Sequence, residues 1–152
     1  MTVLVVDDTI ILRSIIRDLL VEFCNVSKSN IYEASDGMQA VREYKRLRPN
    51  VVFMDIAMPN LDGVETVKQI IEFDPAAKIV MCTGTGGEYV VRECVREGAI
   101  DYLVKPIIPA RLVSAVRNIT GGTPVVRSFE SSDKVISEDF YAIKNKRDDD
   151  SD

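Results

Sequence analysis

Short apolar runs recur along the chain, and the segments between them have the period of a helix. The runs are TVLVV (residues 2–6), IYEA (31–34), VVFM (51–54), KIVMC (78–82) and IDYLV (100–104). Runs of this length that are rich in Val and Ile are typical of strands buried in a sheet. Five strands that alternate with five helices predict a parallel sheet with helices on both faces. The expected fold class is therefore α/β, doubly wound.

Helical spacing is clearest after the first run, where apolar residues recur three and four positions apart as on one face of an amphipathic helix. Between Thr9 and Phe23 they are Ile11, Leu12, Ile15, Ile16, Leu19, Leu20 and Phe23. Four more helices are expected, each bounded by residues that start or stop a helix. They run over residues 36–47, from Asp62 to 74–75, from 86–87 to Gly98, and from Pro109 to 121–122.

Composition excludes several classes of function. The 152 residues carry a formal net charge of −5, so electrostatic binding to nucleic acid or an anionic membrane is not expected. The chain has no histidine, which excludes an imidazole base, a histidine metal ligand and a phosphohistidine on this chain. No leader peptide or membrane span is expected. Cys24, Cys82 and Cys94 form no C-x-x-C motif and are interpreted as inert thiols of a cytoplasmic protein.

Polar side chains follow the predicted strands, at the edge of a parallel sheet where ligands bind. They are Asp7, Asp8, Ser35, Asp55, Thr83 and Lys105. The adjacent carboxylates of Asp7 and Asp8 would repel by roughly 4 kcal/mol at about 4 Å and an effective dielectric near 20. A divalent cation would remove this cost. Three carboxylates without a His or Cys ligand favour Mg²⁺, with Mn²⁺ as a substitute.

Asp55 follows the buried run VVFM, which is a poor place for an unpaired charge. Its carboxylate could act as a nucleophile toward phosphorus if a metal ion and Lys105 neutralised the transferring group. Thr83 could donate a hydrogen bond to a phosphoryl oxygen, and Lys105 could pair with Asp55 at rest and with phosphate afterwards. The catalytic residues expected from this pattern are Asp55, Thr83 and Lys105.

The chain resembles the receiver domain of two-component response regulators, most closely the single-domain chemotaxis type. Four motifs carry the resemblance, in the order and spacing of that family: VVDD (5–8), FMDIAMPNLDG (53–63), TGT (83–85) and DYLVKP (101–106). The resemblance extends from Met1 to about Thr120. It implies a flavodoxin-like sheet with the strand order 2-1-3-4-5 that is known for the chemotaxis member of this fold.

The resemblance also implies roles for the residues at the strand ends. Asp55 would accept a phosphoryl group from the phosphohistidine of a histidine kinase or a phosphotransfer protein. Asp7, Asp8 and Asp55, with the backbone carbonyl of Ala57, would hold Mg²⁺. Because this chain has no histidine, its phosphodonor must be a separate protein.

Thr83 and Tyr102 would form a switch pair. Thr83 would move toward the phosphoryl oxygens, Tyr102 would turn inward from a solvent-facing position, and the surface of the fourth helix, fifth strand and fifth helix would change shape. Lys105 would bind the phosphate, and its bond to Pro106 is expected to be cis. The protein would then be a signalling switch and not a classical enzyme, although it would take part in its own phosphorylation and dephosphorylation.

Expected partners are a sensor histidine kinase, a downstream protein target, a phosphatase and, on phosphorylation, a second copy of the chain. Residues 1–120 are expected to form the receiver domain and residues 121–152 a C-terminal tail, too short for an output domain of its own. Two interpretations of the tail stay open: a flexible extension, or a docking helix that includes Phe140, Tyr141 and Ile143. Nothing in the sequence decides whether the chain stands alone or was cut from a longer regulator.

Two alternatives belong to other classes. A Mg²⁺-dependent phosphatase with an aspartyl nucleophile would need a second Asp two positions after Asp55, and that position is Ala57. A pseudo-receiver that acts only as a scaffold usually lacks part of the acidic cluster, whereas this chain has every member.

Overall fold

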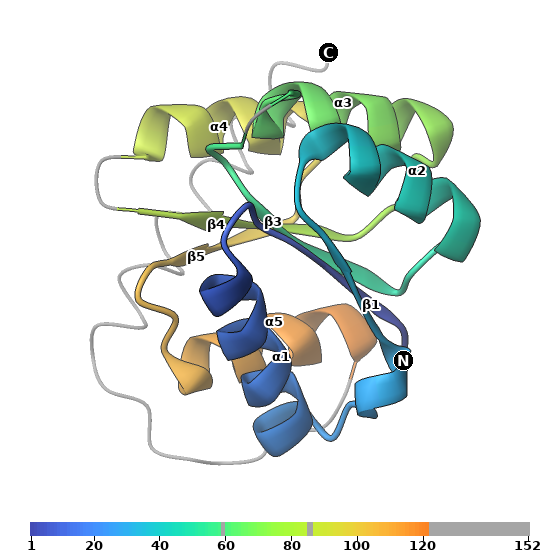
Figure 1. Cartoon of the computed structure of the whole chain (residues 1–152). Coiled ribbons are helices and arrows are strands. Elements are labelled where there is room, and N and C mark those ends of the chain that lie inside the picture. The colour runs from blue at the N-terminus through green and yellow to red at the C-terminus, as the bar shows by residue number, and fades with distance from the viewer. Residues whose placement is uncertain (59, 85–86, 122–152) are drawn as a thin grey trace.

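The structure is a computed structural model that describes residues 1–58, 60–84 and 87–121. Within these residues five strands alternate with five α-helices (Figure 1). The strands are β1 (Val3–Val6), β2 (Ile31–Ala34), β3 (Val51–Asp55), β4 (Ile79–Thr83) and β5 (Asp101–Val104). The helices are α1 (Ile10–Cys24), α2 (Gly37–Leu47), α3 (Gly63–Phe73), α4 (Glu88–Glu97) and α5 (Pro109–Thr120). A short 3-10 turn, Lys28–Asn30, precedes β2 and was not expected from the sequence.

All neighbouring strands run parallel, in the order β2-β1-β3-β4-β5. This confirms both the predicted fold class and the predicted strand order. The three central strands are buried along their whole length, as their uninterrupted apolar sequences indicate. β3 and β4 each extend one residue further than their apolar runs, so Asp55 and Thr83 are the last residues of their strands.

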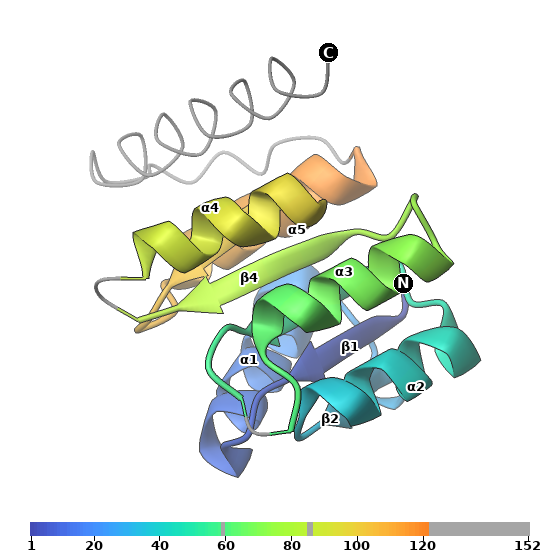
Figure 2. The same ribbon diagram turned by 90° about the horizontal axis from the view of Figure 1, so that it is seen from above.

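Helices cover both faces of the sheet: α2, α3 and α4 lie on one face, and α1 and α5 on the other (Figures 1 and 2). The alternation of side chains along each strand supplies both layers. Leu4 and Val6 of β1 belong to the first core cluster, whereas Val3 and Val5 belong to the second. Among the described helices, none is both long enough and apolar enough to cross a membrane.

The predicted helix ends are largely confirmed. The carboxylate of Asp62 accepts a hydrogen bond from the amide of Glu65 at 2.9 Å, and Asp36 does the same for Gln39 at 2.8 Å. Gly121 follows α5 with a left-handed backbone, as a helix-ending glycine does. The predicted tail beyond Gly121, with its proposed docking helix, lies outside the described residues.

The apolar stripe of α1 is wider than the surface that α1 buries. Ile16 and Leu20 are buried, but Ile11 is 69% exposed and Ile15 is 41% exposed. Ile10, just before the predicted stripe, is 71% exposed. The reason is geometric, because α1 packs on one face of the sheet and beside α5, which together cover only part of its circumference.

The three cysteines have free thiols. Cys82 and Cys94 are buried, and burial raises the pKa of each thiol to about 12. Burial also raises the pKa of the partly exposed Cys24 to about 11. A thiol with a raised pKa forms little of the reactive thiolate, so these side chains behave as small apolar groups.

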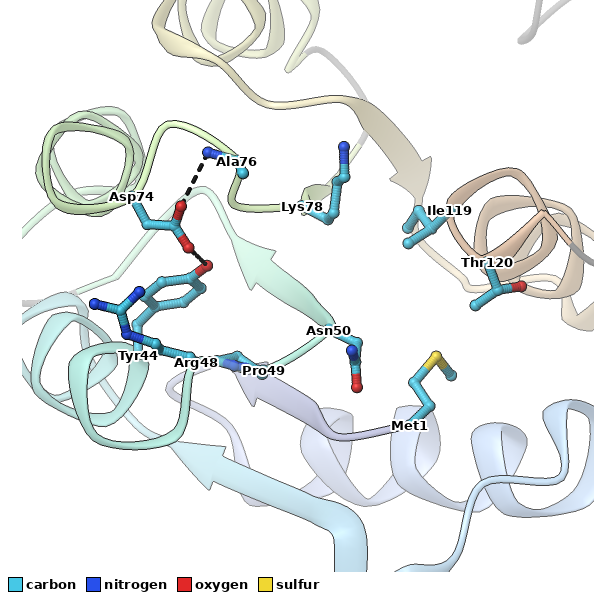
Figure 3. Close-up of a pocket in the computed structure, with 10 residues that line it drawn as sticks. All are labelled: Met1, Tyr44, Arg48, Pro49, Asn50, Asp74, Ala76, Lys78, Ile119 and Thr120. Atoms are coloured by element: carbon cyan, nitrogen blue, oxygen red, sulfur yellow. Dashed lines mark hydrogen bonds between the residues drawn. The ribbon is translucent and has the colours of Figure 1, made fainter.

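A cavity of about 550 Å³ opens at the amino ends of the strands, opposite the predicted site (Figure 3). Its lining includes Asn50 and Lys78, which directly precede β3 and β4. On one wall the hydroxyl of Tyr44 donates to the carboxylate of Asp74 at 2.8 Å, and that carboxylate also accepts from the amide of Ala76 at 3.0 Å. None of the predicted site residues lines this cavity.

Gly37 allows a close approach between α2 and α3. A Cβ atom at this position would overlap the hydroxyl of Thr66 and the backbone carbonyl of Leu61. We expect Gly37→Ala to lower the free energy of unfolding by about 1–3 kcal/mol, as overpacking in a core does. Urea denaturation followed by circular dichroism measures this change. Gly84→Ala is the matched control, since a Cβ there has no described atom within 4 Å; equal losses in both variants would contradict the packing argument.

Candidate functional site

The carboxyl ends of neighbouring strands bring the predicted acidic residues together. β1 and β3 pair with Val6 opposite Met54, so Asp7 and Asp55 follow at equivalent positions on adjacent strands. Asp8 comes next in the chain, before α1 begins. One carboxylate oxygen from each of Asp7, Asp8 and Asp55 lies within 4.8 Å of the other two. The predicted acidic cluster is therefore present as a compact group of oxygen ligands.

Two of these carboxylates are buried and the third is exposed. Asp7 is 1% exposed and Asp55 is 7% exposed, whereas Asp8 faces solvent. Burial removes the water that would otherwise stabilise the two charges. An exposed third ligand leaves one side of the cluster open to solvent and to an incoming group.

Lys105 provides the positive charge. Its Nζ lies 3.2 Å from Oδ2 of Asp7 and 3.1 Å from Oδ1 of Asp55, so one ammonium pairs with both buried carboxylates. The amide of Lys105 donates to the carbonyl of Thr83 at 2.7 Å and fixes the end of β5 beside β4. The peptide bond between Lys105 and Pro106 is cis, as predicted.

The electrostatic balance of the site remains negative. Burial raises the pKa of Asp55; the hydrogen bond from Lys105 opposes this rise, the charge of Asp7 adds to it, and the net direction is upward. Burial of the Lys105 ammonium lowers its pKa, but the hydrogen bonds and charges of Asp55 and Asp7 together outweigh burial, and the pKa of Lys105 is raised. Three carboxylates and one ammonium have a formal charge of −3 + 1 = −2. A single divalent cation would balance it.

Other groups hold Asp7 in place. Its Oδ1 accepts from the amide of Thr9 at 2.9 Å, and its backbone carbonyl accepts from Nη1 of Arg13 at 2.6 Å. The same guanidinium donates through Nε to Glu33 on β2 at 3.2 Å. Arg13 was not among the residues predicted from the sequence, although its place in the first turn of a helix that begins at this edge is a usable signal.

The remaining predicted residues lie around the cluster. Thr83 is 5% exposed, and its hydroxyl donates to the carbonyl of Gly84 at 3.0 Å and packs against Gly87, where a Cβ would overlap it. Tyr102 is 8% exposed and packs in the core cluster with residues of α4, which is an inward position. Both the amide and the hydroxyl of Ser35 donate to Oε1 of Gln39, at 2.9 and 3.0 Å.

Ala57 lies beside the Asp55 carboxylate, and the metal-binding role of its carbonyl stays a prediction. Its side chain is small and exposed, and its backbone amide lies close enough to stabilise the Asp55 carboxylate by a hydrogen bond. An alanine here offers no carboxyl group as a general acid. The arrangement as a whole can bind a hard cation through oxygen atoms and present one carboxylate, with an ammonium beside it, to a phosphorus atom.

Comparison with known proteins supports the resemblance to receiver domains along most of the chain. The family model of the response regulator receiver domain matches residues 3–117. The chemotaxis protein CheY of Thermotoga maritima is 37% identical over 118 residues, which are 78% of this chain and 96% of that protein. Protein CcdB of Bacillus subtilis is 41% identical over 119 residues, covering 78% of this chain and 97% of that protein.

Solved structures agree in fold. The receiver domain of NtrX from Brucella abortus superposes with a TM-score of 0.72 at 26% identity, covering 80% of this chain and 99% of that one. A response regulator receiver domain from Clostridium thermocellum gives the same TM-score and identity, with 79% and 94% covered. Receiver domains of this kind are signalling switches rather than classical enzymes, and they act with histidine kinases. Sequence, fold and the acidic cluster together show that this chain belongs to the response regulator receiver family.

Proposed function

We propose that this protein is a stand-alone chemotaxis-type response regulator in the cytoplasm. Asp55 accepts a phosphoryl group from the phosphohistidine of a partner kinase, and the surface of α4, β5 and α5 then changes its affinity for a downstream protein. The observation that supports this proposal best is the position of Lys105, which contacts both Asp7 and Asp55 at the open edge of the sheet. The similarity to the chemotaxis proteins CheY of Thermotoga maritima and Bacillus subtilis supports the chemotaxis role.

The residues of the site fit Mg²⁺. The ligand set has only oxygen donors, its side-chain members lie within 4.8 Å of one another, and its charge is −2 after Lys105 is counted. Asp7, Asp8, Asp55 and the carbonyl of Ala57 would hold the ion. Bound Mg²⁺ would neutralise charge on the cluster and on the transferring phosphoryl group.

The transfer itself needs one nucleophile and one cation from this chain. An oxygen of the Asp55 carboxylate forms the new O–P bond as the N–P bond to the donor imidazole breaks, and the leaving nitrogen keeps the electron pair of that bond. Lys105 Nζ, 3.1 Å from Asp55, pairs with the charge on the phosphoryl oxygens. Thr83 then leaves the carbonyl of Gly84 and donates its hydroxyl to a phosphoryl oxygen.

Residues 1–120 form the phosphoacceptor unit in this proposal, and residues 121–152 extend it. The histidine kinase, the downstream protein and a phosphatase are its proposed partners, together with a second copy of the chain on phosphorylation. Inward placement of Tyr102, which is 8% exposed, corresponds to the phosphorylated position of the switch. The outward position remains a prediction.

We expect acetyl phosphate to phosphorylate the protein only in the presence of Mg²⁺, and Asp55→Asn to abolish the modification. Lys105→Met should slow it by on the order of 100-fold, because a charge partner of the transferring group is lost. Intact-protein mass spectrometry over time measures both effects. Lys78→Met, an exposed lysine at the opposite end of the sheet, is the control and should react at the wild-type rate. Equal labelling of Asp55→Asn and wild type would disprove the proposal.

Without metal, Asp55→Asn should also stabilise the fold. The raised pKa of Asp55 means that folding disfavours its ionised form, and Lys105 keeps Asp7 as a partner when that charge is removed. In EDTA at pH 7 we expect a gain on the order of 1 kcal/mol. The gain should shrink as the pH falls through the raised pKa of Asp55. Wild-type Asp55 then takes up a proton, and the free-energy cost of burying its charge disappears. Denaturation at a series of pH values tests this; a variant less stable than wild type at pH 7 would contradict it.

Gly87 offers a test of the role of Thr83. A Cβ at this position would overlap the Thr83 hydroxyl in its present rotamer, so Gly87→Ala should favour rotamers that leave Gly84. If such a rotamer of Thr83 is the one that binds phosphate, the variant should bind beryllofluoride several-fold more tightly. The reason is that a larger fraction of the free protein already has Thr83 in the binding rotamer. A titration followed by ¹⁹F NMR measures this affinity. In a Thr83→Ala background Gly87→Ala should have no effect; the same gain in that background would rule out Thr83 as the cause.

A further inference from the structure

β5 is an edge strand whose outward backbone groups need partners. Within residues 1–58, 60–84 and 87–121 it pairs only with β4, the next strand of the sheet. The amide of Lys105 donates to the carbonyl of Thr83, and because backbone groups of a strand alternate in direction, those of Tyr102 point away from β4. Unpaired groups on an edge strand invite another chain to pair with them.

The side chains of Asp101 and Arg111 satisfy both outward groups of Tyr102. Oδ1 of Asp101 accepts from the Tyr102 amide at 2.7 Å, and Nη2 of Arg111 donates to the Tyr102 carbonyl at 2.7 Å. The same Nη2 donates to Oδ1 of Asp101 at 3.0 Å and closes the set. We call this arrangement the Asp101–Arg111 clamp.

The clamp is buried, which makes stability alone a weak explanation for it. The side chains of Arg111 and Asp101 are only 6% and 11% exposed. Nε of Arg111 is buried without a hydrogen-bond partner within the part of the chain that the structure describes. A buried ion pair is often no more stabilising than two apolar side chains of the same volume, so its value must lie partly in what it positions.

What the clamp positions is the backbone of Tyr102. A hydrogen bond to the amide limits rotation on one side of Cα, and a hydrogen bond to the carbonyl limits it on the other. Side-chain rotamers depend on the backbone angles, so a fixed backbone restricts the ring to few discrete positions. Arg111 lies in the first turn of α5, and the clamp therefore also joins this turn to β5.

We propose that Asp101 and Arg111 are positioning residues for Tyr102, which hold its backbone so that the ring moves between two defined positions and transmit that movement to α5. This inference rests on the proposed function, in which Tyr102 is a switch residue. Without the clamp, the Tyr102 ring would occupy a mixture of positions whatever the state of Asp55. Phosphoryl acceptance at Asp55 itself would not depend on the clamp, because neither residue contacts the acidic cluster.

The test uses the full chain, which has five tyrosines, labelled with 3-fluorotyrosine. ¹⁹F NMR spectra are recorded with Mg²⁺ alone and after addition of beryllofluoride, and Tyr102→Phe assigns the Tyr102 signal. The signal of bound beryllofluoride reports occupancy of Asp55 in the same spectrum. In wild type we expect the Tyr102 signal to shift between two positions. In Arg111→Met we expect equal occupancy of Asp55 but a shift of the Tyr102 signal at least threefold smaller.

Two further variants separate positioning from stability. Val116→Ala truncates a buried side chain of α5 and destabilises the same helix without contact to Tyr102, so it should keep the full shift. Arg111→Lys keeps the charge next to Asp101 and should recover part of the shift, and it also replaces Arg111→Met if that variant does not fold.

The outcomes are distinguishable. A full wild-type shift in the folded Arg111 variants, or an equal loss in Val116→Ala, would overturn the clamp proposal and leave the proposed function intact. A wild type that binds beryllofluoride without any shift of Tyr102 would remove both the switch role of Tyr102 and the role of the clamp, but not phosphoryl acceptance. If wild type binds no beryllofluoride, the proposed function fails, and the clamp proposal fails with it.

Discussion

The contact of one ammonium with two buried carboxylates is the interaction on which the site depends. Asp7 directly follows β1 and Asp55 ends the adjacent strand β3 at the equivalent position, so the sheet itself brings two negative charges together where both side chains are largely buried. Lys105, at about 3 Å from each, makes this placement tolerable but does not neutralise the cluster. In the proposed function, the remaining charge of −2 would give the edge of the sheet its affinity for a dication. A site that was fully balanced by protein groups would have no such affinity.

The position of Lys105 directly after β5 suggests how phosphorylation of Asp55 would change the structure at the end of β5. Lys105 directly follows β5, and β4 and β3 separate β5 from β1. Its side chain therefore reaches across the sheet edge to Asp7 while its amide remains bonded to Thr83. In the proposed function, a change in the charge at Asp55 would alter the electrostatic attraction on Lys105 and, through the backbone of Lys105, the end of β5. This path involves covalent bonds and a strand pairing, and it requires no long chain of side-chain contacts.

The sequence predicted the fold because alternation of buried strands and helices has few solutions. It also predicted that the polar residues at the strand ends share one edge of the sheet, since every parallel strand ends there. The approach of Asp7 to Asp55 is different, because it requires β1 and β3 to be neighbours, and the strand order came from the resemblance and not from periodicity. Periodicity likewise identified α1 as a helix but could not show that Ile10 and Ile11 are exposed, because exposure depends on how much of the helix its neighbours cover.

Pairs of charged residues in different elements were the part that the sequence did not predict. Arg13 contacts the Asp7 carbonyl, and Arg111 contacts Asp101, ten positions earlier in the chain. In each case a helix brings a guanidinium over a strand, and the partner depends on the turn between them. No residue pattern directly encodes the angle that this turn sets between the helix and the strand. Charged residues in mostly apolar faces of α1 and α5 are nevertheless a usable signal, since such residues are rarely buried without a partner.

The Asp101–Arg111 clamp and the acidic cluster differ in a way that matches their proposed roles. The Asp101–Arg111 clamp is neutral, and both residues bond to the backbone of Tyr102. The cluster of Asp7, Asp8, Asp55 and Lys105 is negative and open on the side of Asp8. A neutral pair whose hydrogen bonds are directed at the two peptide units that flank the Cα of Tyr102 has little to offer an ion and, in our proposal, serves to fix that backbone. An unbalanced cluster with an open side would attract a cation and, with it, a phosphoryl group. On these proposals the chain separates the groups that bind from the groups that hold the backbone, and the segment with β5 connects them, because Tyr102 and Lys105 lie three residues apart in it.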